Sequence, residues 1–325
     1  MKHTLLAICS LLFISGAQAG ESGTYGYAYW GPKFIREYLK QVDDNSPAEG
    51  APRCESMYSN ALSKGVLDIR YALGYFDDST GHDAIWNGIN YGLSPSLDIE
   101  VYNALRSEWT SRCRSRTQRL CGFKESGDPK NGLAILQKNM VLHGRQILVR
   151  ITLTQSSASP SFVLNKGKLK DRQDFLTAQS EKYFFGGLRS ADIVLYNGHS
   201  RNGGGPDFAP PILNSANKVN YKGYYEVKRP GIQKTLAALQ ENPNKGIIIG
   251  LFSCYSRLHF YKTFTAANAN QRMILSAETI DYVDSLKASV GYLEGFLRGT
   301  CGDDLAATAK QYDKIRSGFQ GYKLN

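Results

Sequence analysis

The stretch that decides the fold reads ADIVLYNGHS and spans Ala191–Ser200. Its apolar run is continuous rather than alternating, which predicts a strand covered on both faces, as in a parallel sheet. Glycine and a histidine follow where the apolar run ends. A second run of this kind, GIIIGLFSC at Gly246–Cys254, ends in a thiol. Both stretches therefore predict a buried strand that carries a reactive side chain to the edge of a sheet.

Strand and helix patterns alternate from about residue 145 onward. A helix that begins at Arg172 is expected to end at Gly186-Gly187, because glycine is common just past a helix end. The alternation predicts an α/β fold with a mostly parallel sheet. The expected strands are 146–154, 191–198, 246–254 and 272–278, and the expected helices are 172–188, 230–242, 258–269 and 285–299.

The first 19 residues have the pattern of an export signal. Lys2 precedes a short apolar run, Leu5–Ile14, and the A-x-A cleavage pattern at Ala17–Ala19 follows. This run is too short to span a bilayer, and no later stretch of about 18 apolar residues follows it. We expect residues 1–19 to be a signal peptide and the mature protein to be soluble, periplasmic or secreted, with no transmembrane span.

Export makes disulfide bonds an expected feature of the mature chain. Of six cysteines, Cys9 would leave with the signal, so five remain and at least one thiol is left over. On one unbroken helix Cys113 and Cys121 would lie about 12 Å apart, beyond the reach of a disulfide. If these two pair, the helix must end between them. The candidates for two bridges, with the connectivity open, are Cys54, Cys113, Cys121 and Cys301.

The region 20–144 differs from the rest of the chain. It carries all three tryptophans and three of the mature cysteines. Helical patterns occur near 34–42, 56–62 and 99–112. We expect a mostly helical, disulfide-bearing region at 20–144, followed by an α/β domain at 145–325.

Two chemically reactive residues follow the carboxyl ends of predicted strands, His199 and Cys254. Ligands of open α/β sheets bind at that edge. An imidazole beside a thiol can hold it as a thiolate and can protonate a leaving amine. Backbone N–H groups near both residues could stabilise an oxyanion. The pattern therefore predicts nucleophilic catalysis by a cysteine–histidine pair.

The order of these motifs resembles the caspase-like cysteine peptidases, a group that includes caspases, legumains, gingipains, separases and CHAT domains. The resemblance covers residues 145 to about 315 and consists of an apolar strand into NGHS, a second into LFSCYS and a third, RMILSAETID. It implies a three-layer sandwich, His199 as the catalytic histidine, Cys254 as the nucleophile and cleavage of protein or peptide substrates through a thioester. It implies no metal or organic cofactor.

One position departs from that family's pattern. The His-Gly of the family is His199-Ser200 here. The resemblance then implies that the backbone N–H groups of Ser200 and Cys254 form the oxyanion hole. For the first substrate subsite, Arg201 is a candidate for an acidic preference, and Asp207 and Asp284 are candidates for a basic one.

The remaining histidines have structural interpretations. His143 precedes a predicted strand rather than ending one. His259 lies five residues after Cys254 on a predicted helix and is expected to point away from it. His82 lies in a turn-rich loop and is expected to be exposed.

Two other functions remain open for this sequence. GHSRN, Gly198–Asn202, approaches the G-x-S-x-G elbow of α/β-hydrolases and would make Ser200 a nucleophile. Its fifth position is not glycine, and His259 is the one histidine downstream. The second alternative is a secreted binding protein on a catalytically degenerate caspase-like scaffold.

The chain is basic, with a formal net charge of +10. This charge would attract an anionic surface or polymer. The densest run of cations is expected to be a solvated helix face and comprises Arg112, Arg114, Arg116 and Arg119. No zinc-finger spacing or RNA-binding motif accompanies it, so nucleic acid is not an expected partner.

Overall fold

The computed structural model describes residues 49–75, 85–86, 89–90, 97–159, 161–242, 246–280, 282–310 and 318–325. The signal peptide, the helix expected at 34–42 and His82 lie outside these ranges. No helix in the described ranges is long and apolar enough to cross a membrane.

A single mixed sheet of eight strands forms the centre of the molecule, in the order β10-β9-β8-β7-β1-β6-β5-β4. The five neighbouring strands from β9 to β6 are parallel, whereas β10, β5 and β4 are antiparallel to their neighbours. The bounds are β1 Val66–Leu73, β4 Lys124–Asp128, β5 Leu133–Leu142, β6 Arg145–Thr154, β7 Ile193–Asn197, β8 Ile248–Phe252, β9 Arg272–Ser276 and β10 Phe319–Tyr322. A separate small hairpin pairs β2 Ile85–Trp86 with β3 Ile89–Asn90.

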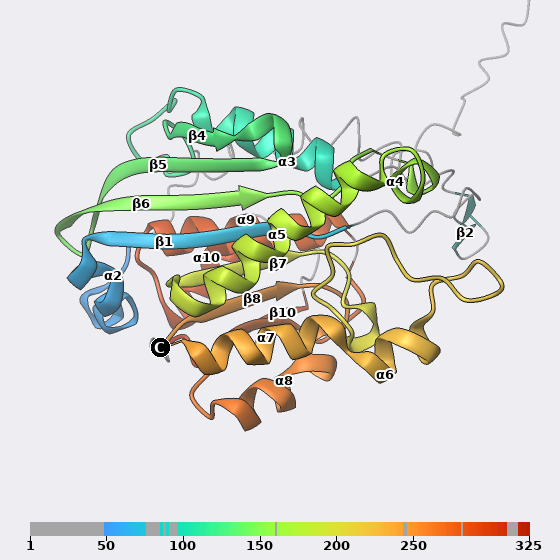
Figure 1. Ribbon diagram of the computed structural model, residues 1–325. Helices are drawn as coiled ribbons and strands as arrows, with labels where there is room; N and C mark the ends of the chain where they lie inside the picture. The colour runs from blue at the N-terminus through green and yellow to red at the C-terminus, as the bar shows by residue number, and fades with distance from the viewer. Residues whose placement is uncertain are drawn as a thin grey trace, which may run out of the picture.

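Helices cover both faces of this sheet (Figure 1). One face packs against α5 Lys170–Ser190, α7 Pro230–Glu241 and α8 Ser256–Ala267, and the other against α3 Leu97–Thr110, α9 Tyr282–Leu297 and α10 Gly302–Lys310. Alternate residues of β7 enter the two cores, Val194 on the first face and Ile193 on the second. The fold is thus a three-layer α/β sandwich with a mostly parallel sheet, as the alternation of patterns predicts.

Short helical segments connect these elements. They are the 3-10 turns η1 Pro52–Tyr58, η2 Pro129–Asn131 and η3 Arg201–Gly203, the π-helical turn η4 Tyr221–Tyr225, and the short helices α2 Ser59–Lys64, α4 Phe162–Lys166 and α6 Glu226–Lys228.

The described part of the region 20–144 is not mostly helical, contrary to expectation. It supplies β1, β4 and β5 to the same sheet as the later strands. The sequence pattern did not indicate strand β1, because Asp68 and Arg70 interrupt its apolar residues. Asp68 is nevertheless buried, since its carboxylate pairs with Arg70 and Arg150. The chain passes residue 144 in a hairpin between β5 and β6, where His143 and Gly144 both have positive φ.

Helix α5 does not end at Gly186-Gly187 but continues to Ser190. A Cβ atom on Gly187 would lie 2.4 Å from Cγ of Arg70 on β1. The glycine therefore permits a close approach of helix to sheet rather than a helix end. This is the physical reason for the difference.

Two disulfides connect the four expected cysteines, Cys54–Cys301 and Cys113–Cys121. Helix α3 ends at Thr110, before the second pair, as that pairing requires. Cys254 takes part in neither bridge.

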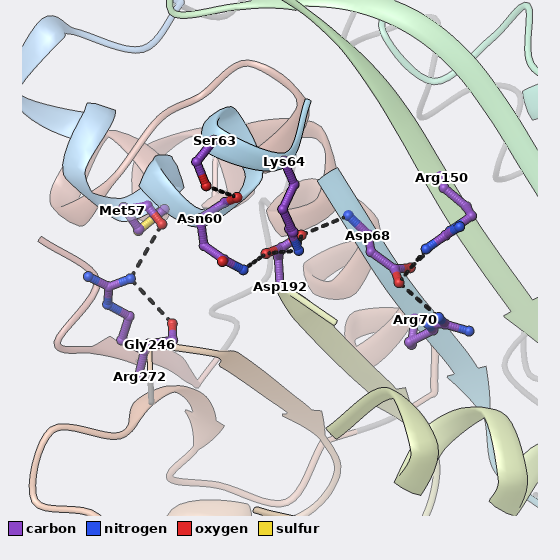
Figure 2. A network of polar contacts seen from close by, with 10 residues as sticks. All are labelled: Met57, Asn60, Ser63, Lys64, Asp68, Arg70, Arg150, Asp192, Gly246 and Arg272. Carbon is purple, nitrogen blue, oxygen red and sulfur yellow. Dashed lines mark hydrogen bonds and ion pairs between the residues drawn. The ribbon is translucent and has the colours of Figure 1, made fainter. Parts of the chain in front are cut away.

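A polar network fastens the amino ends of the central strands (Figure 2). The Asp192 carboxylate, just before β7, accepts hydrogen bonds from Asn60 and Lys64 of α2 and from the backbone N–H of Asp68 on β1. It therefore ties a helix and two strands together at one buried point.

Candidate functional site

Strands β7 and β8 bring His199 and Cys254 to the same edge of the sheet. The two strands are parallel neighbours, with Asn197 paired to Phe252, and Gly198 donates a hydrogen bond to the Phe252 carbonyl at 3.3 Å. His199 and Cys254 each stand two residues beyond this paired position, and both are partly exposed. The imidazole and the thiol thus belong to adjacent strand ends, although 55 positions separate them in the chain.

The Cys254 thiol lies against the backbone that connects β9 to α9. Its Sγ atom is 3.3 Å from the carbonyl oxygen of Ile280, to which the thiol can donate, and 3.5 Å from the N–H of the same residue. A thiolate would retain the second contact, with the N–H as donor. Ile280 is two residues before the start of α9, where the helix dipole favours negative charge. Tyr255, which follows Cys254, is held in place as well, because its backbone N–H donates a hydrogen bond to the Glu278 carbonyl at 2.8 Å.

Helix α9 touches both strand ends through Ser285. Its hydroxyl lies 2.9 Å from the Phe252 carbonyl oxygen and 3.1 Å from Oδ1 of Asn197. The Asn197 amide donates to Ser289, whose hydroxyl also contacts Tyr71. Sequence reasoning did not identify these positioning residues, although the asparagine in YNGHS was a polar residue at the end of an apolar strand.

The Tyr196 side chain holds the backbone of His199 in place. Its buried hydroxyl lies 3.0 Å from the carbonyl oxygen of His199 and accepts the N–H of Asp207 at 3.0 Å. Burial raises the pKa of Tyr196 well above its ordinary value, so this hydroxyl keeps its proton. A Cβ atom on Gly198 would lie 2.5 Å from the hydroxyl, so the glycine between strand and histidine is required sterically.

Arg201 and Asp207 form an ion pair within the loop that follows His199. Arg201 is 1% exposed, and its Nε lies 2.9 Å from Oδ2 of Asp207. The guanidinium also lies over the Tyr225 ring, whose hydroxyl donates to the same carboxylate oxygen. Both side chains are engaged in closing the loop after His199, and the selection of substrate charge by Arg201 or Asp207 stays a prediction.

Asp284 is also an internal group. It lies in the first turn of α9, is 7% exposed and has Lys287 Nζ 3.9 Å from its carboxylate. Its neighbour Ser285 touches the strand ends, so Asp284 is near the site in the chain but is covered by protein.

Ser200 adopts an ordinary backbone conformation, with φ −74° and ψ −16°. A side chain causes no strain there, since positive φ values fall on the next three residues instead, Arg201–Gly203. The Ser200 carbonyl accepts hydrogen bonds from the N–H groups of Gly203 and Gly205. The position at which the caspase-like peptidases have glycine therefore accommodates serine here without distortion.

His259 lies against the loop that follows His199, a contact that the sequence did not predict. A Cβ atom on Gly203 would be 3.3 Å from its Nδ1. Burial, and then the charge of Arg229, lower the pKa of His259. The imidazole is thus a packing group behind the loop.

Ser253 precedes the thiol and is buried, and its hydroxyl has no hydrogen-bond partner among the described residues. Among all the residues that the structure describes, no group of three or more histidine, cysteine, aspartate or glutamate side chains is arranged to hold a metal ion.

A scan against models of known protein families matches none, and searches of curated proteins and of solved structures find no significant match. A functional assignment therefore depends on the chemistry and placement of this chain's own residues.

Proposed function

We propose that the protein is a caspase-like cysteine peptidase in which Cys254 is the nucleophile and His199 transfers protons. The observation that carries the proposal is the pairing of β7 with β8, which delivers a partly exposed imidazole and a partly exposed thiol to the same sheet edge. The other four cysteines described are held in disulfides, so this thiol stands apart chemically.

The proposed reaction begins with attack of the Cys254 thiolate on a peptide carbonyl carbon. A C–S bond forms as the carbonyl electron pair moves to oxygen, and backbone N–H groups near Ser200 and Cys254 stabilise that charge. The C–N bond then breaks while the His199 imidazolium gives its proton to the leaving amine. Water attacks the resulting thioester, His199 accepts the proton of that water, and the acid product leaves with the thiolate restored.

The backbone around the pair supports this chemistry. Tyr196 and the Arg201–Asp207 ion pair hold the loop that presents His199. Ser285 holds the end of β8 just before Cys254. Positioned groups of this kind lower the cost of reaching the reactive geometry.

The serine hydrolase alternative has less support from the geometry. Ser200 is 5% exposed and is followed by a 3-10 turn, whereas a nucleophile elbow presents its serine before a helix. The alternative of a degenerate binding protein makes a different prediction for the thiol, and one experiment distinguishes the two.

That experiment is the pH dependence of iodoacetamide labelling at Cys254, measured without reductant so that the disulfides stay intact. We expect labelling well below pH 8 in the wild type and its loss in His199→Ala, with Cys254→Ala as the blank. Labelling that follows an ordinary thiol, with a pKa of about 8.5, and ignores His199→Ala would reject the mechanism. Covalent labelling of Ser200 by a fluorophosphonate would favour the hydrolase instead. A peptide library, with Cys254→Ala as control, then gives the cleavage preference.

A further inference from the structure

The arginine run between α3 and β4 lines a groove and is not a helix face. Residues 111–121 leave the helix after Thr110, and the Cys113–Cys121 disulfide closes them into a loop against β5. The groove has a volume of about 730 Å³ and is open to solvent. Its lining contains the four arginines of the run and Lys138, with Cys113, Ser115, Gln118, Asn139, Met140 and Val141.

Hydrogen bonds from cations beneath the loop hold its backbone in place. The Lys138 ammonium donates to the carbonyls of Arg119 and Cys121 at 3.1 and 2.8 Å. Arg298, at the end of α9, donates to the Thr117 carbonyl at 2.8 Å. With the disulfide, these contacts preform the groove, so a ligand would meet a surface that needs little ordering.

The groove has more positive charge than its surroundings neutralise. Arg114 pairs with Glu108, and Arg119 pairs with Glu49. Arg112 and Arg116 are exposed, and no carboxylate contacts either of them within the described residues. No acidic side chain lines the groove in the part of the chain that the structure describes. Burial, and then the charge of Arg119, lower the pKa of Lys138, as expected where positive charges crowd together.

We propose that this groove binds a linear polymer of phosphate groups. Arginine forks match phosphate oxygens in two-point hydrogen bonds, and several cations spaced along an open groove suit a ligand with repeated charges. Among the described residues no aromatic side chain lines the groove, so these residues offer nucleic acid bases no stacking surface of the kind that single-strand sites provide. The proposal is independent of the peptidase proposal, since it uses none of the residues at the ends of β7 and β8.

The test is titration of the full chain with inorganic polyphosphate of about 15 units, by calorimetry at pH 7 over a series of KCl concentrations. We expect binding that weakens with salt. The variant Arg112→Ser/Arg116→Ser should bind about tenfold more weakly, and its slope of log K against log salt should be shallower by about 1.5, since each lost phosphate contact removes about 0.7–0.9. Both side chains are exposed, so the variant should keep the melting temperature of the wild type.

The matched control is Lys222→Ser/Lys228→Ser, which removes the same charge from exposed positions around α6, away from β5 (Figure 1). It should bind polyphosphate nearly as the wild type does. Equal losses in both variants would mean that net charge alone is responsible and would overturn the site. Equal or tighter binding of single-stranded DNA of matched charge, or binding to anionic lipid vesicles without binding to polyphosphate, would overturn the choice of ligand.

Discussion

The central sheet has an amino edge, where its parallel strands begin, and a carboxyl edge, where they end. The two edges use polar residues in opposite ways. At the amino edge, buried carboxylates meet cations directly, as Asp192 does with Lys64 and Asp68 with Arg150 (Figure 2). At the carboxyl edge, His199 and Cys254 are partly exposed. Hydrogen bonds there go mainly to the backbone that carries these two residues.

Unusual backbone conformations occur next to the two reactive residues. Non-glycine residues with positive φ flank the carboxyl edge at Arg201, Asn202 and Tyr255. Such conformations cost energy and persist where surrounding contacts enforce them. The comparison teaches that one edge holds the sheet together, while the other holds two reactive groups in place. Mutations at the two edges should therefore separate activity from stability.

The largest effect is expected at the carboxyl edge. Cys254→Ala should abolish the proposed peptide cleavage, a loss of about 10³-fold or more, because the proposed thioester forms on the sulfur of this residue. The melting temperature should change little, since the residue is small and partly exposed. Activity assays and thermal melts on one preparation check both statements. Substantial residual cleavage would place the nucleophile elsewhere.

The amino edge should show the reverse behaviour. Asp192→Ala should lower the free energy of unfolding by about 3 kcal/mol, because it leaves Lys64, Asn60 and a backbone N–H without their acceptor. The rate of Cys254 labelling per folded molecule should stay the same. The control, Glu241→Ala, breaks the exposed pair with Arg189 and should cost less than about 1 kcal/mol. Equal urea midpoints for the two variants would contradict the assigned role of the network.

Asp207 tests whether the loop ion pair positions His199. Asp207→Asn weakens the contact with Arg201 Nε while keeping the side-chain shape, and kcat for peptide cleavage should fall about tenfold with KM nearly unchanged. Asp207→Glu should restore part of the loss. A change in KM alone would instead indicate a role in substrate binding.

A further prediction is a pH dependence of stability that arises at a buried carboxyl group in helix α9. Burial raises the pKa of Glu294 from 4.5 to about 7, and the neighbouring Arg298 offsets this only in part. Between these values the folded protein binds more protons than the unfolded chain, so stability should decline as pH rises from about 4.5 to 7 and then level off. Urea unfolding at pH 5 and pH 7.5 should show this decline in the wild type and less of it in Glu294→Gln. The same slope in both proteins would contradict the assignment.

Much of the fold could be predicted from the sequence, because buried parallel strands are continuous apolar runs. The expected strand at 246–254 and helix at 230–242 match β8 and α7 closely. Strand β1 was missed because its charged residues are neutralised by partners up to 82 positions away, such as Arg150. The sequence carries no local sign of such long-range pairing.

The candidate site was predictable to a similar degree. His199 and Cys254 follow apolar strands, and the pairing of β7 with β8 puts them at one edge as expected. The roles of Arg201, Asp207 and Asp284 were not predictable. A charged side chain in a loop gives no indication of whether it faces a substrate or, as Arg201 does, another loop residue.

The Cys54–Cys301 disulfide joins two positions that are 247 residues apart in the chain. This bridge determines what happens to the protein after proteolytic cleavage. A single proteolytic nick anywhere between these residues, including one made by the protein itself, would leave both fragments covalently linked. On a non-reducing gel the nicked protein would migrate near its full mass, and the two pieces would separate only after reduction. Maturation by internal cleavage could therefore take place without loss of either half of the sheet.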